Sequence, residues 1–261
     1  MKQKINTLLY GCLILLSSIT AQQLQAQTCV ELVTNGSFET VTTTPPYNSQ
    51  PGYPSFMPYA TGWNQHVVPN YNGTPDLFTT SSPTNPIVNN SVHIPCSFYG
   101  YQNARTGNSY AGLLTVHNDN SFSGANCSEF ITTNFTSTLT AGKIYEVSLW
   151  VSRADLAGFA INGLGVWIGT AGINAQADIP TYNCPTSLLN NDAWTQITFP
   201  YCANGDETLI IIGGSSTTYG STLTLPSYTC TQNSNYNNPT QGAGSYIFID
   251  DVSVKEVAFT V

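Results

Sequence analysis

Apolar and polar side chains alternate along several short segments of this chain, and this alternation constrains the fold more than any other feature. Residues 145–152 place Tyr, Val, Leu and Val on one side and Glu, Ser, Trp and Ser on the other. Residues 164–169 and 246–254 alternate in the same way. A period of two is that of a half-buried β-strand, and no long segment shows the period of a helix. We therefore expect an all-β chain.

Further segments extend this pattern into a sandwich. Residues 208–212 form a nearly continuous apolar run, which is typical of a strand covered on both faces. Other expected strands lie near residues 29–34, 109–117, 127–133 and 194–201. About nine antiparallel strands separated by turn residues predict a β-sandwich. The polar segments 41–104 and 215–244 each contain a cysteine, so we interpret them as long ordered loops over the sandwich.

The first 27 residues have the order of a secretory signal peptide. Residues 1–4 are basic, residues 5–21 are mostly apolar, and residues 22–27 are polar with a small residue at Ala26. The apolar run is shorter than the roughly 20 residues that span a bilayer, which disfavours a membrane anchor. No second stretch is long enough to span a membrane. We expect residues 28–261 to form a single domain that is secreted or held at the cell surface.

Charge is scarce in this chain, at 8% of its residues. The expected signal peptide is followed by fourteen acidic residues but only four cationic ones, which are Arg105, Lys143, Arg153 and Lys255. Because phosphate binding needs many Lys and Arg side chains, we do not expect nucleic acid as a partner. An anionic membrane is disfavoured for the same reason.

No familiar catalytic motif occurs in the sequence. It has no GxSxG elbow, HExxH helix or phosphate-binding loop. A glycoside hydrolase needs two carboxylates across a cleft, and candidates such as Asp76, Glu129, Glu146 and Asp155 are not paired by their spacing. We therefore expect a protein that is not an enzyme, with a glycoside hydrolase as an alternative.

Six cysteines follow the expected signal peptide: Cys29, Cys96, Cys127, Cys184, Cys202 and Cys230. An even number of cysteines in an exported chain predicts disulfide bonds, here three, although fifteen pairings are possible. Zinc binding is the alternative. The sequence lacks a CxxC pair or a Cys/His cluster at ligand spacing, which favours structural bridges.

Five short motifs follow one another along the chain in a recognisable order. They are Asn-Gly-Ser-Phe-Glu at 35–39, Thr-Gly-Asn-Ser-Tyr-Ala-Gly at 106–112, residues 139–152, Trp194 with the turn at 201–205, and Ile-Asp-Asp-Val-Ser-Val at 249–254. Together they resemble the galactose-binding-like jelly rolls that include the family 4 and family 9 carbohydrate-binding modules. The loop at 73–78 also resembles one in secreted surface proteins of gliding bacteria. The resemblance implies a jelly-roll β-sandwich and, as a partner, a glycan.

The resemblance also implies a structural calcium ion. Its ligands would be Glu39 and Asp250, with backbone carbonyl oxygens near Arg105 and Asn108 completing an oxygen shell. The alternation of the last strand places Asp250 on the row of Phe248, facing the core, where a carboxylate needs a counter-charge or a metal. Two alternatives remain: Asp250 accepts only backbone hydrogen bonds, or the neighbouring Asp251 is the inward residue.

Two indoles are candidates for binding a sugar. Trp150 and Trp167 sit on the alternate faces of their strands beside Ser and Gly residues. A flat ring with polar neighbours suits a sugar, and Glu146 would accept hydrogen bonds from its hydroxyl groups. These residues predict a non-catalytic glycan-binding protein whose ligand is a glycan or cell-surface polysaccharide. The alternatives are that loops bury both indoles as a second layer of core, and that the protein is a cell-surface adhesin or structural interaction protein.

Overall fold

The computed structural model describes nine stretches of the chain: residues 29–45, 55–69, 73–83, 92–97, 99–117, 128–160, 163–184, 193–215 and 244–257. All the elements named below belong to one compact unit, Val30–Val257. The expected signal peptide lies outside the described residues, as do Cys127 and Cys230. Within the described residues, no helix is long and apolar enough to cross a membrane.

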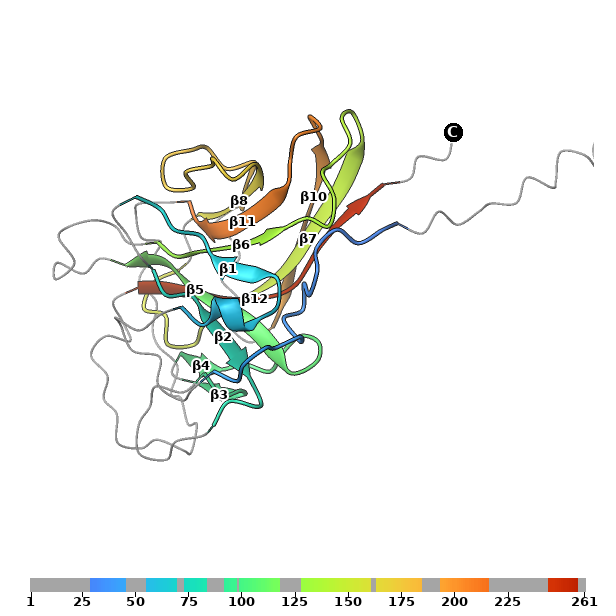
Figure 1. Cartoon of the computed structure of the whole chain (residues 1–261). Helices are drawn as coiled ribbons and strands as arrows, with labels where there is room; N and C mark the ends of the chain where they lie inside the picture. The colour runs from blue at the N-terminus through green and yellow to red at the C-terminus, as the bar shows by residue number, and fades with distance from the viewer. Residues whose placement is uncertain are drawn as a thin grey trace, which may run out of the picture. The chain divides into compact units, whose positions relative to one another are not determined.

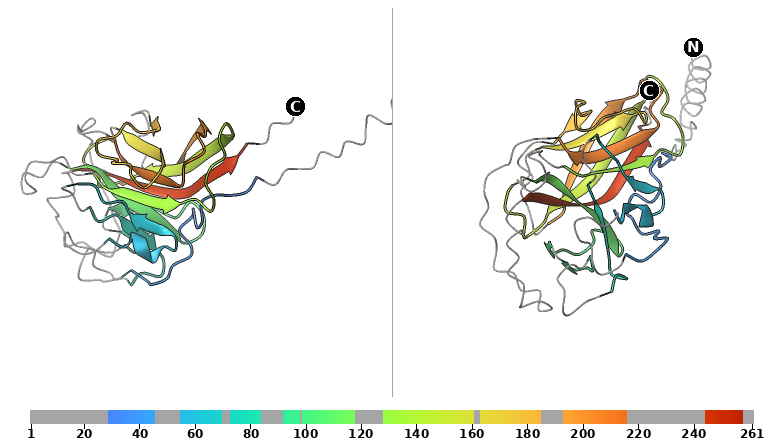
Figure 2. Two further views of the ribbon diagram at one scale, coloured as in Figure 1. Left: turned by 45° about the horizontal axis from the view of Figure 1, so that its top comes forward. Right: turned by 60° about the vertical axis from the view of Figure 1, so that its left-hand side comes forward.

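One short 3-10 helix and twelve strands make up the described structure. They are η1 (Met57–Tyr59), β1 (Trp63–Gln65), β2 (Asp76–Thr79), β3 (Cys96–Ser97), β4 (Gly100–Tyr101), β5 (Ser109–His117), β6 (Phe130–Asn134), β7 (Ile144–Arg153), β8 (Leu164–Gly169), β9 (Tyr182–Asn183), β10 (Thr195–Cys202), β11 (Leu209–Gly214) and β12 (Gly244–Glu256). The strands form two five-stranded sheets, β1-β6-β11-β8-β9 and β10-β7-β12-β5-β2, and a small β3-β4 pair. Each paired strand runs antiparallel to its neighbour. Figures 1 and 2 show the two large sheets as layers.

The main hydrophobic core lies between the two sheets. It combines Leu149 and Ile249 of one sheet with Ile131 and Ile210 of the other, all 0% exposed. The alternation read from the sequence holds here, since Leu164, Val166 and Ile168 of β8 all enter this core. The jelly-roll type of β-sandwich expected from the sequence is therefore confirmed.

The alternation fails in the last strand, where β12 contains a β-bulge. Its pairing with β7 shifts between Asp250 and Ser253, and Asp251 adopts a left-handed backbone with φ of 48°. Ile249 and Val252, three residues apart, both enter the core, whereas Phe248 packs in a cluster on the outer face. Asp250 therefore lies on the outer face with Phe248. The predicted inward row of Asp250 with Val252 was wrong because a bulge resets the two-residue period.

Two expectations about the first hundred residues also need correction. The segment near 29–34 forms isolated bridges rather than a strand, pairing Glu31 with Lys255 of β12 and Val33 with Phe135 beyond β6. It therefore touches both sheets. The segment 41–104 holds η1 and the first four strands, so it contributes edge strands to both sheets and is more than a loop laid over them.

The cysteines do not form the three predicted bridges. Cys29 and Cys202 are exposed free thiols, and Cys184 is 6% exposed within the main core. Burial raises the pKa of Cys184 to about 11. Cys96 is disulfide-bonded. The even count suggested complete pairing, but Cys184 serves as a small apolar side chain in the core.

We predict that Gly36→Ala severely destabilises the fold. A Cβ atom on Gly36 would lie 1.9 Å from the carbonyl oxygen of Val252, whose N–H donates to the Gly36 carbonyl at 2.9 Å. Forcing an atom into such a contact costs about 1–3 kcal/mol or more, because the backbone must move. Thermal unfolding should show a clearly lower melting temperature. Gly172→Ala is the matched control, since its Cβ meets nothing within 4 Å; equal melting temperatures for the two variants would contradict the prediction.

Candidate functional site

One open face of the sandwich carries the candidate site. On the outer face of β7, Glu146 is exposed and Ser148 and Trp150 are half-buried. Trp150 pairs with Gln196 of β10 on one side and with Asp250 of β12 on the other. Exposed side chains continue along β10 at Gln196, Thr198 and Pro200. Along β7 and β10 the described side chains of this face are mostly polar, with the half-buried indole of Trp150 on β7 and that of Trp194 just before β10.

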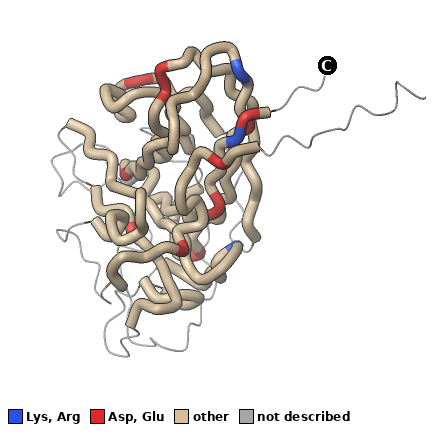
Figure 3. Tube along the Cα trace, turned by 45° about the vertical axis from the view of Figure 1, so that its right-hand side comes forward, with Lys and Arg blue, Asp and Glu red and all other residues tan. Residues whose placement is uncertain are grey.

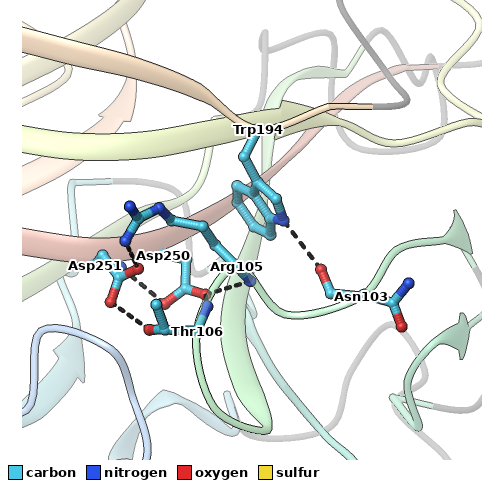
Figure 4. Close-up of polar contacts among 6 residues, drawn as sticks. All are labelled: Asn103, Arg105, Thr106, Trp194, Asp250 and Asp251. Atoms are coloured by element: carbon cyan, nitrogen blue, oxygen red, sulfur yellow. Dashed lines mark hydrogen bonds and ion pairs between the residues drawn. The ribbon is translucent and has the colours of Figure 1, made fainter.

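A loop formed by residues 102–108 borders this face, and side chains of the sheet hold it in place. The Ser152 hydroxyl donates to the side-chain carbonyl of Gln102 at 2.9 Å. The Trp194 indole N–H donates to the Asn103 carbonyl at 3.0 Å, and Figure 4 shows that indole beside the loop. Trp194 also packs edge-on against Tyr110.

Asp250 anchors the middle of the loop. Its carboxylate is 0% exposed and accepts backbone N–H groups from Arg105 at 2.9 Å, Thr106 at 3.3 Å and Asp251 at 2.7 Å. Burial, followed by the charge of Asp251, raises the pKa of Asp250 from 3.8 to about 8. These three N–H groups lower the pKa again but do not offset burial. The carboxylate is buried without a cation beside it among the described residues.

Glu39 anchors the end of the same loop. Its Oε1 atom accepts the N–H groups of Asn108 and Ser109, both at 2.8 Å. Gly107 leaves room for this carboxylate, since a Cβ there would lie 2.3 Å from the Glu39 Cδ atom. The structure thus brings Glu39 and Asp250 to one loop, as the resemblance implied. The loop presents N–H groups to them, and the Asn108 carbonyl accepts the Thr80 N–H at 3.0 Å.

Arg105 links the loop to the indole. The Cζ atom of its guanidinium lies 4.0 Å from the centre of the Trp150 ring. Its Nη1 atom donates to Asp251 Oδ2 at 2.5 Å, and the Thr106 hydroxyl donates to Asp251 Oδ1 at 2.6 Å (Figure 4). The sequence singled out Arg105 for its backbone carbonyl; its contact with Trp150 carried no signal in the sequence.

Trp167 lies elsewhere, and the predicted platform of two indoles was wrong. Its side chain is 2% exposed and packs in a separate outer cluster with Phe130, Leu209 and Ile211. The segment after β8 covers it, because Ala175 joins that cluster and the Trp167 indole N–H donates to the Asp178 carbonyl at 3.0 Å. The reason is topological: β7 and β8 belong to opposite sheets, so their outer faces point in opposite directions.

A second group of buried acids contacts β5 and β12. The Tyr246 hydroxyl donates to Asp76 at 2.9 Å, and Glu129 accepts the N–H groups of Thr74 at 2.7 Å and Leu114 at 2.8 Å. Burial raises the pKa of Glu129 to about 7. Both Glu129 oxygens are engaged by the backbone, so this acid ties segments of the two sheets together.

Lys and Arg are few on the described chain, and Asp and Glu are more numerous (Figure 3). Lys143 pairs with Glu256 at 2.9 Å and Lys255 with Glu31 at 3.4 Å. Arg153 is 7% exposed and donates to backbone carbonyls. Within the described residues, no group of three or more His, Cys, Asp or Glu side chains is placed to hold a metal ion. The calcium site implied by the resemblance has only two side-chain ligands, Glu39 and Asp250, so it falls below that number.

Comparisons with known proteins find similarity in structure only. No protein-family model and no curated protein matches the chain. A xylan-binding domain of Xyn10C from Paenibacillus barcinonensis covers 90% of this chain and 99% of its own length, at 12% identity and a TM-score of 0.43. A family 4 carbohydrate-binding module covers 86% and 99%, at 16% identity and a TM-score of 0.38. An adhesin domain of Lys-gingipain from Porphyromonas gingivalis covers 87% and 98%, at 12% identity and a TM-score of 0.40. Because these identities and TM-scores are low, the function has to be inferred from this chain's own residues.

We predict that the two indoles respond differently to truncation. Trp167→Ala should lower the free energy of unfolding by about 3–5 kcal/mol, because it leaves a cavity among packed rings. Trp150→Ala should cost less than about 2 kcal/mol, since its ring is half-exposed. Denaturant unfolding of both variants measures the difference. A larger loss for Trp150→Ala than for Trp167→Ala would contradict these positions.

Proposed function

We propose that the protein is a secreted, non-catalytic binding protein that holds a glycan on the outer face of β10, β7 and β12. The observation that carries the proposal is Trp150, a half-exposed indole that lies beside polar side chains of β7 and β10, among them Ser148 and Gln196. The apolar face of a sugar ring stacks on such an indole while its hydroxyl groups bond to neighbouring polar side chains.

The neighbours of Trp150 supply both kinds of hydrogen-bonding group. Glu146 accepts, whereas Ser148, Gln196 and Thr198 can donate or accept. Nearby Lys255 is already paired with Glu31. Such a face suits a ligand rich in hydroxyl groups, and its openness predicts modest affinity, because a shallow surface buries little of the ligand.

The binding prediction is tested with affinity electrophoresis against a panel of soluble polysaccharides and with a parallel assay for released reducing sugars. Wild type should be retarded by at least one polysaccharide and release no sugar. Trp150→Ala should weaken binding tenfold or more through the loss of a stacking ring, and Glu146→Gln about three- to tenfold, because Gln still accepts a hydrogen bond but without the negative charge that strengthens it.

Asp206→Asn is the matched control for Glu146→Gln, because Asp206 is an exposed acid in the turn after β10. It should bind like wild type. If no polysaccharide is bound, a cell-surface adhesin for protein partners replaces this proposal. If sugar is released, a glycoside hydrolase does.

We also propose that Glu39 and Asp250 hold one calcium ion beside the 102–108 loop. Two carboxylates already reach this loop, and the bonds to Glu39 within the described residues use only Oε1. Oxygen ligands of this kind suit calcium. A bound cation would also supply the positive charge that the buried Asp250 carboxylate lacks among the described residues. The role of the ion would be structural.

The calcium proposal is tested by the melting temperature, which a rise in pH should lower and added calcium should raise. Unfolded Asp250 titrates near 3.8 and folded Asp250 near 8, so the folded state holds the proton more tightly between these values. In a chelator, the melting temperature should therefore fall as the pH rises from about 4 to about 8. At pH 8, calcium should raise it again by mass action.

Asp250→Asn should remove this calcium response. Glu129→Gln should keep it, although Glu129 adds to the pH slope in the same direction because its pKa is also raised. A wild-type melt at pH 8 that is the same in chelator and in calcium rules the ion out.

A further inference from the structure

The Arg105 guanidinium covers the ring on which the proposed function depends. Its Cζ atom lies 4.0 Å from the Trp150 ring centre, which is the separation of stacked groups in contact. A sugar ring that stacks on the same face of the indole would need the same space. This inference rests on the proposed function, because it concerns how a ligand gains access to Trp150.

Weak contacts hold the Arg105 side chain in this position. One is the cation–π contact itself, and the other is the ion pair with Asp251. The two side chains of that pair are 33% and 19% exposed, so water and salt screen their attraction. At such exposure, each contact favours the covered position by no more than about fivefold.

The surroundings allow the side chain to leave while the backbone stays. The Arg105 N–H is fixed by the buried Asp250 carboxylate, so movement is confined to the side chain. Asp251 keeps its bond from the Thr106 hydroxyl when the guanidinium departs. The β12 bulge, with the left-handed backbone of Asp251, places this residue beside the loop independently of Arg105.

We propose that Arg105 is a displaceable cover on Trp150, and that the ligand competes with it for the indole face. The apparent affinity of the site is then lowered by the fraction of molecules in which the ring is covered. Because an ion pair helps to hold the cover, a neutral ligand binds more tightly as the ionic strength rises. Arg105 thereby determines the affinity of the site without needing to touch the ligand.

Hydroxyl-radical footprinting with residue-resolved mass spectrometry tests the cover without any glycan. Oxidation of Trp150 should rise several-fold in Arg105→Ala, and also in wild type when NaCl is raised from 0.05 to 1 M. Asp251→Asn should show a smaller rise, since Asn tolerates the left-handed backbone and retains a hydrogen bond from Thr106. Trp167, buried in the same molecule, is the internal control and should not change. Unchanged oxidation of Trp150 in Arg105→Ala overturns the proposal.

Calorimetric titration with xylohexaose and with cellohexaose provides the second arm. Arg105→Ala should bind roughly tenfold more tightly than wild type, and salt should tighten binding to wild type but not to the variant. Weaker binding by Arg105→Ala means that the arginine contacts the ligand, which overturns the cover alone. Wild-type affinity in Trp150→Ala overturns the proposed function instead. If neither sugar binds, footprinting decides the proposal about Arg105.

Discussion

The arrangement of the candidate site depends on the bulge in β12. Without it, Asp250 would remain on the same row as Val252 and Val254, inside the core, where a carboxylate is costly to bury. With it, Asp250 faces outward beneath the 102–108 loop and receives three backbone N–H groups. The same bulge puts Asp251 where Arg105 and Thr106 reach it. The bulge therefore brings both Asp250 and Asp251 to the loop that carries Arg105.

Local periodicity was sufficient to predict the central strands and the fold class. The side chains of β7 and β8 that enter the main core follow the alternation read from the sequence, because regular pairing repeats every two residues. The edge strands β1 and β2 escaped prediction because each has only three or four residues, too few to show a period. The bulge was not predicted for a different reason. Asp251 adopts a left-handed backbone conformation that Asp tolerates, so the sequence has no glycine at this position that would have indicated a bulge.

The site was predictable residue by residue but not as an assembly. Trp150 and Glu146 lie on one outer face of β7, as their spacing required. Trp167 has the same local pattern, yet sheet membership, which depends on long-range pairing, puts it on the opposite side. Its burial depends further on Ile173 and Ala175 in the turn that follows β8. The residues around Trp167 do not reveal to which sheet its strand belongs.

The strand order has a consequence for how the chain acquires its structure. β12 comes last among the described strands yet lies in the middle of its sheet, between β7 and β5. Until residues 244–256 are available, that sheet is two separate parts with exposed edges, and the segment around Glu31 lacks its partner Lys255. Contacts between segments far apart in the sequence form slowly, because the entropy of closing a long loop is lost before the contacts stabilise the chain. Synthesis from the N-terminus therefore leaves this sheet incomplete until residues 244–256 have emerged, and a chain that has not yet folded can still be threaded through a narrow channel.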